Sequence, residues 1–170
     1  MAAWFSGLVN TVAGAAQYQC IADDPSLEGR DMRIAAGKHP NVDKKGMVWR
    51  QSSVLKVWKE CHIVVTKDSL MYWYTSPSDA YPEEVIALKK ATGVRRQEGG
   101  PRPHSFILSG KGVVYPFAAN SEEDMEAWLR TIGKGIVRAT TTEWDETSDR
   151  LAEQQAQGEE RAEEGAQGDQ

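Results

Sequence analysis

Between residues 46 and 118, apolar and aromatic residues occur in short runs separated by turn-forming residues. Leu70-Met-Tyr-Trp-Tyr74 is aromatic and favours a strand. The stretch Val57–Val65 first alternates between polar and apolar positions and then becomes apolar throughout. Clusters of Gly, Pro, Ser and Asp lie between the runs and mark turns. The pattern predicts seven strands, over residues 46–50, 57–65, 70–74, 85–88, 93–95, 105–108 and 113–118.

After residue 120 the apolar positions change to helical spacing. Ser121 is suited to cap the first turn of a helix, with Asp124 three residues later. The apolar residues that share one face of this helix are Met125, Trp128, Leu129, Ile132 and Ile136. Closely spaced short strands followed by one amphipathic helix predict a mainly β domain, a small barrel or sandwich. We expect the helix to cap its open end, with Trp128 packed inward.

Composition divides the chain into four segments. Residues 1–22 contain no charged side chain and predict an amphipathic N-terminal helix. Residues 23–43 are interpreted as a polar linker, and residues 44–138 as the folded domain. Residues 139–170 form an acidic, low-complexity tail, which we expect to be disordered or a loosely held helix in solvent.

Charge is distributed unevenly, although the net charge is only -5. Residues 38–139 hold 16 Lys/Arg against 11 Asp/Glu, whereas residues 140–170 hold 2 against 10. A basic domain favours an anionic partner such as a membrane surface or an acidic peptide. The excess is small, so an ordinary solvated surface also accounts for it.

The sequence contains no pattern typical of catalysis, so we predict a protein that is not an enzyme, with no cofactor and no metal. Gly110-Lys111-Gly112 lacks the spacing of a phosphate-binding loop. The modest domain charge and the acidic tail argue against nucleic-acid binding. Cys20 and Cys61 fit no redox or ligand spacing, which indicates a reducing compartment, and residues 1–22 resemble neither a signal peptide nor a membrane span. We expect a cytoplasmic protein.

Residues 44–137 resemble a pleckstrin homology (PH) domain. Lys45-Gly46-Met47-Val48 is similar to the opening motif of that family, and Val57–Val65 to its second strand. Leu70-Met71-Tyr72-Trp73 and the helix with Trp128 follow in the family's order. The resemblance implies two orthogonal sheets with seven strands in total, closed by a C-terminal α-helix.

The resemblance also implies a lipid-binding position at the first loop. Family members that bind phosphoinositides use basic residues there, and Arg50 and Lys59 match two of these positions. Cys61 and Tyr74 stand where further basic residues are usual, and a neutral side chain supplies no charge-assisted bond to phosphate. The resemblance therefore implies weak or broad binding of anionic lipid. The candidate headgroup-binding residues are Lys44, Lys45, Arg50, Lys56 and Lys59.

The N-terminal segment has two interpretations. In one, Trp4, Phe5 and Leu8 insert into a membrane as part of an interfacial helix, and the chain is a peripheral signalling adaptor. In the other, the segment folds back onto the domain or binds a partner protein, and the domain is a protein-interaction scaffold without a lipid role. Cys20 is a candidate for acylation, although an unmodified thiol is the simpler interpretation.

Overall fold

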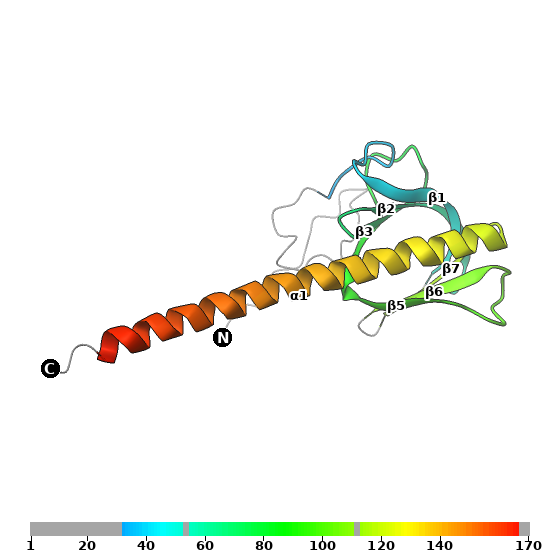
Figure 1. The fold of residues 1–170 in the computed structure, drawn as a ribbon. Helices are drawn as coiled ribbons and strands as arrows, with labels where there is room; N and C mark the ends of the chain where they lie inside the picture. The colour runs from blue at the N-terminus through cyan, green and yellow to red at the C-terminus, as the bar shows by residue number, and fades with distance from the viewer. Residues whose placement is uncertain (1–31, 53–54, 111–112, 167–170) are drawn as a thin grey trace, which may run out of the picture.

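The computed structural model describes residues 32–52, 55–110 and 113–166, which form seven strands and one long helix (Figure 1). The elements are β1 (Val42–Gln51), β2 (Trp58–Thr66), β3 (Leu70–Tyr74), β4 (Glu84–Ala87), the short 3-10 helix η2 (Leu88–Lys90), β5 (Ala91–Arg96), β6 (Ser105–Gly110), β7 (Val113–Ala118) and α1 (Glu122–Ala166). All seven predicted strands are therefore confirmed, and so is the fold class of a mainly β domain with a C-terminal helix.

The strands form one antiparallel sheet in the order β4-β3-β2-β1-β7-β6-β5. β1 pairs with both β2 and β7, so it belongs to both halves of the sheet. Antiparallel pairing places the β1–β2 and β3–β4 connections at the same end. β1 and β7 are antiparallel, and Trp49, near the end of β1, pairs with Ala118, the last residue of β7. The first residues of β7 therefore lie beyond the end of β1. The β6–β7 connection therefore also lies at this end, which we call the open end.

The core lies between the inner faces of the sheet and one face of α1. Met125, Trp128 and Ile132 are fully buried there, as the helical spacing predicted. Ser121 caps the helix, because its Oγ accepts a hydrogen bond from the backbone N–H of Asp124 at 3.1 Å.

A second apolar cluster lies on the outer face of β2, β3 and β4. Residues 32–41, which we call the strap, cover this face and bury Met32 and Ala36 against Tyr72 and Tyr74. The described part of the predicted polar linker is thus packed on the sheet. The reason is that β3 directs apolar side chains to both of its faces, so that its outer face also has to be covered.

α1 runs across the domain and projects well beyond it, through most of the predicted tail (Figure 1). Side-chain contacts from α1 to the domain extend as far as Arg138, which pairs with Asp43 at 2.8 Å. The predicted N-terminal helix lies outside the described residues. None of the described helices has the length and apolarity needed to cross a bilayer.

Candidate functional site

An ion pair joins the bases of the three connections at the open end. Arg50, near the end of β1, places Nη2 2.8 Å from Oε2 of Glu84, the first residue of β4. Tyr115 on β7 donates a hydrogen bond from its hydroxyl to Oε1 of Glu84 at 3.0 Å. The side chains of Arg50 and Glu84 are only 15% and 14% exposed to solvent. The arginine predicted to receive a phosphate is therefore already paired with a carboxylate of the same chain.

Two inward-facing residues surround this pair. The Arg50 guanidinium lies over the Trp73 ring, 3.8 Å from its centroid, which fixes the arginine's orientation. Cys61 is buried on β2, and burial raises the pKa of its thiol to about 12, although the charge of Arg50 acts in the opposite direction. Cys61 therefore stays a neutral thiol and supplies neither a charge nor a reactive thiolate.

Around the paired arginine, the three connections expose apolar and basic side chains. We call this set the rim, and it consists of Leu55, Lys56, Val57, Lys59, Tyr81, Val113 and Val114. Leu55 is 76% exposed and Val114 53% exposed, which is unusual for such residues in a folded domain. Within the described residues, neither Lys56 nor Lys59 forms an ion pair. The rim thus combines unpaired positive charge with exposed apolar surface.

The other two predicted lysines lie elsewhere. Lys44 pairs with Asp124 of α1 at 2.8 Å, and its Nζ lies 4.6 Å from the centroid of the Trp128 ring. Lys45 is exposed, but it points to the opposite face of β1. Both precede Arg50 by five or six residues, which places them roughly 20 Å along the strand. The structure therefore brings Arg50, Lys56 and Lys59 together, without Lys44 and Lys45.

Sequence reasoning did not include Glu84 or Tyr115 in the site. The available signal was a carboxylate at the start of an otherwise apolar strand, Glu84-Val-Ile-Ala87. Tyr74, which occupies a position where the family often has a basic residue, packs in the apolar cluster on the outer face of the sheet. Its hydroxyl donates a 2.7 Å hydrogen bond to the carbonyl of Ile34, so it anchors the strap. The predicted insertion residues Trp4, Phe5 and Leu8 lie outside the described residues.

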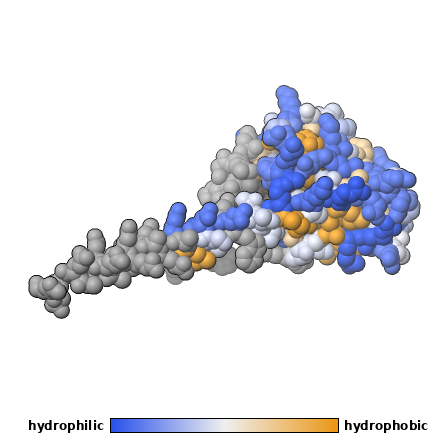
Figure 2. All heavy atoms as spheres, viewed as in Figure 1, coloured by the Kyte–Doolittle hydropathy of each residue, from blue (hydrophilic) through white to orange (hydrophobic). Residues whose placement is uncertain are grey.

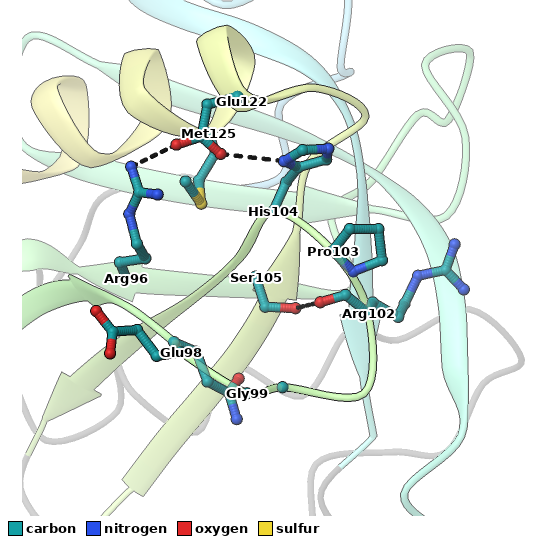
Figure 3. A pocket seen from close by; sticks show the side chains of 11 residues that line it. Arg96, Glu98, Gly99, Arg102, Pro103, His104, Ser105, Glu122 and Met125 are labelled. Atoms are coloured by element: carbon teal, nitrogen blue, oxygen red, sulfur yellow. Dashed lines mark hydrogen bonds and ion pairs between the residues drawn. The ribbon is translucent and has the colours of Figure 1, made fainter.

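A pocket of about 330 Å³ lies between the β5–β6 loop and the first turn of α1 (Figure 3). Three of its charged or titratable groups are paired with one another: Glu122 accepts from Arg96 at 2.5 Å and is 3.1 Å from His104 Nδ1. These contacts with His104 and Arg96 lower the pKa of Glu122. The Arg102 side chain extends away from the pocket and stacks on Trp49 at 4.0 Å (Figure 3). This pocket therefore offers less unpaired charge than the rim, and no metal-binding group of side chains occurs in the described ranges.

Known proteins resemble this chain over the domain. Pleckstrin homology domain-containing protein 1 of Arabidopsis thaliana is 26% identical over 124 residues, covering 62% of this chain and 85% of that protein. The human interactor protein for cytohesin exchange factors 1 is 24% identical over 119 residues, covering 67% of this chain but only 27% of that protein.

Solved structures show the same fold. A solution structure of a pleckstrin homology domain is 27% identical with a TM-score of 0.51, and the match covers 58% of this chain and 88% of that one. The C-terminal PH domain of pleckstrin, solved in complex with D-myo-Ins(1,2,3,5,6)P5, is 19% identical with a TM-score of 0.53, covering 58% and 99%. The family model for the PH domain matches residues 42–137, and the chain belongs to the PH domain family.

Proposed function

We propose that this PH domain is a non-enzymatic adaptor that contacts anionic membrane surfaces weakly and peripherally through its rim. The observation that carries the proposal is that the exposed apolar Leu55 and Val57 lie beside Lys56 and Lys59, at the β1–β2 connection and the start of β2, and that neither lysine forms an ion pair with a described residue. Apolar side chains of this kind enter the headgroup region, while lysines beside them attract acidic lipid.

The Arg50–Glu84 pair determines the kind of contact that we propose. A phosphate that entered the open end would have to displace the Glu84 carboxylate from a half-buried arginine. Such displacement leaves a carboxylate without its partner in a poorly hydrated place, which is costly. The rim lysines carry no such cost, so the proposed contact is with the membrane surface and not with a headgroup held inside the domain.

Weak binding follows from the number of free charges. Each lysine near an acidic membrane contributes about 1 kcal/mol, so Lys56 and Lys59 together give about 2 kcal/mol. Insertion of Trp4, Phe5 and Leu8 would add a second weak anchor on the same chain. Two weak anchors on one molecule hold it far better than either does alone.

The test is vesicle sedimentation with the full chain. Vesicles contain phosphatidylcholine alone, or phosphatidylcholine with either phosphatidylserine or a phosphoinositide. Lys56→Gln/Lys59→Gln should weaken binding to both acidic vesicles by about 30-fold, the equivalent of 2 kcal/mol. The control, Lys67→Gln/Arg130→Gln, removes the same charge from exposed positions in the β2–β3 turn and on α1, away from the rim, and should bind as the native chain does.

Two results would contradict the proposal. One is equal weakening by the control pair, because binding would then depend on total charge and not on the rim. The other is absence of native binding to any vesicle, which would favour a protein partner at the same exposed apolar surface.

A further inference from the structure

The strap and the exit of α1 meet at the end of the domain opposite the open end. Arg138 of α1 pairs with Asp43 and also donates to the carbonyl oxygen of Lys67 in the β2–β3 turn. The Lys67 amide in turn donates to the carbonyl of Asn41, the last residue of the strap, at 2.8 Å. The place where α1 leaves the domain is therefore linked to the end of the strap through Lys67.

The strap runs out along the sheet and returns. Tyr72 donates to the sulfur of Met32 at 3.6 Å, and the Ala36 amide then reaches the carbonyl of Asp79 in the β3–β4 connection. A turn follows, closed by a 2.8 Å bond from the Lys38 amide to the carbonyl of Ala35. The strap then returns to Asn41. Because of this reversal, Met32 lies at Tyr72, in the middle of β3.

Beyond that exit, α1 presents apolar residues on one side. Val137 is 65% exposed and Leu151 is 55% exposed, and Trp144 lies midway between them in the sequence. A seven-residue spacing places all three positions on the same side of a helix. We call them the outer strip. A groove of about 420 Å³ lies beside Val137, and Figure 2 shows a hydrophobic patch on the projecting part of α1.

Charge limits what can cover the outer strip. Residues 143–164 carry nine Asp/Glu and two Arg, so two copies of this helix would repel each other. Residues 1–22 of the same chain carry no charge. As the helix expected from the sequence, they would place Trp4, Phe5, Leu8, Val9 and Val12 on one side.

Distance also favours the chain's own N-terminal segment. The nine residues 23–31 can span roughly 30 Å when extended, and Val137 to Leu151 covers roughly 21 Å of helix. Tyr72, which Met32 contacts, is five residues from Lys67, which Arg138 contacts, so a linker of this length reaches the near end of the outer strip. Tethering gives it an effective concentration in the millimolar range, which no free partner matches.

We propose that residues 4–12 pack their apolar side against the outer strip of α1 when no membrane is present. The docked segment covers Trp4, Phe5 and Leu8 together with Val137 and the adjoining part of the outer strip, since nine residues would span about 13 Å as a helix. One consequence rests on the proposed function: because these three N-terminal residues are also the proposed membrane anchor, docking on α1 and insertion into a bilayer exclude each other.

Hydrogen exchange on the full chain, without vesicles, tests the docking alone. Trp4→Ser/Phe5→Ser/Leu8→Ser should make the amides of residues 137–151 exchange on the order of ten-fold faster, the equivalent of about 1.4 kcal/mol. Asn10→Ser/Gln17→Ser changes the polar side of the same segment and should leave this exchange unchanged. Equal exchange in the native chain and the apolar-side variant would overturn the proposal.

A second measurement changes residues of the outer strip and not of the N-terminal segment. Val137→Ser/Leu151→Ser should release the segment and so make its amides exchange faster. Sedimentation velocity should show a monomer for both the native chain and this variant. A native dimer that the substitutions dissociate would assign the strip to a second copy and overturn the proposal. Faster exchange without any vesicle binding would leave the docking supported and reject only the membrane function.

Discussion

Trp128 holds the helix, the sheet and a surface lysine together through a single ring. It is fully buried, its Nε1 donates to Asp124 at 3.2 Å, and Lys44 lies above its face. Gly46 approaches the ring so closely that an added Cβ would lie 3.4 Å from it. Trp128→Ala should therefore lower the free energy of unfolding by about 3–5 kcal/mol. Urea unfolding measures this, and Leu151→Ala on the projecting helix should have little effect on the same transition.

Two glycines in α1 allow a sharper test of packing. A Cβ at position 135 would lie 2.5 Å from Cδ1 of Leu88, which is fully buried. Gly135→Ala should thus destabilise the domain by about 1–3 kcal/mol, although alanine favours a helix. A Cβ added at Gly133 would lie 3.9 Å from its nearest neighbour, Cγ1 of Val94, which is an ordinary van der Waals distance. Gly133→Ala should stabilise by up to about 1 kcal/mol, and equal melting temperatures for both variants would contradict this packing.

At the scale of single residues, the sequence revealed the candidate charges but not their partners. Arg50 and Lys44 were both predicted to bind headgroups, yet each is paired with a carboxylate that is far away in sequence, Glu84 and Asp124. Local pattern contains no information about such long-range pairs. By contrast, Lys56 and Lys59 lie in or beside a connection with apolar neighbours, and their exposure follows from that local context.

Among the elements, the strap carries a titratable group, His39, in its returning part. The centroids of the His39 and Tyr72 rings are 4.2 Å apart, and Nε2 of His39 is hydrogen-bonded to the hydroxyl of Tyr74. Burial lowers the pKa of His39 below its usual 6.5, with Asp68 acting in the opposite direction. His39 Nδ1 is buried without a hydrogen-bond partner in the described ranges. Protonation would therefore place an unsatisfied N–H and a charge under the strap.

This predicts a pH-dependent stability. Because the pKa of His39 is lower in the folded chain, the unfolded chain binds more protons once the pH falls below about 6.5. The free energy of unfolding should therefore decrease from about pH 7 to pH 5. Urea unfolding across this range should show a flatter dependence for His39→Gln. His62, whose pKa burial also lowers, contributes in the same direction.

The control for this prediction is His104→Gln, since His104 lies at the pocket beside Glu122, away from the strap. That variant should keep the native decrease in stability at low pH. A native slope in His39→Gln would show that the strap does not respond to protonation of this residue.

The strands were predictable because their two-residue alternation and intervening turns are local properties of the sequence. The strap was not, because the apolar run Met32-Arg-Ile-Ala-Ala36 is short, consists partly of small residues and lies between polar stretches, so its periodicity is not distinctive. Its partners Tyr72 and Tyr74 looked like ordinary strand residues. Helical backbone continues through residues 139–166, one of the two alternatives expected for the tail, although these residues lack an apolar face typical of a core helix.

On the scale of the whole molecule, positive and negative charge are separated along one axis. The basic domain lies at one end, and the acidic half of α1 extends roughly 40 Å past Arg138. Removing negative charge with Glu159→Gln/Glu160→Gln/Glu163→Gln/Glu164→Gln should strengthen binding to phosphatidylserine vesicles at low ionic strength. The gain should disappear near physiological salt, where the Debye length is only about 8 Å. A gain that persists in salt would indicate direct contact between the tail and the rim.

The unbroken course of α1 makes the projecting half act as a lever fixed to the domain. Its attachment through Trp128, Ile132 and Arg138 allows little independent swing at the exit. A tilt of the domain by about 10° would then move the far end of the helix by roughly 7 Å. A small change in the tilt of the domain on a surface therefore displaces the end of α1 far enough to make or break its contacts with a neighbouring molecule.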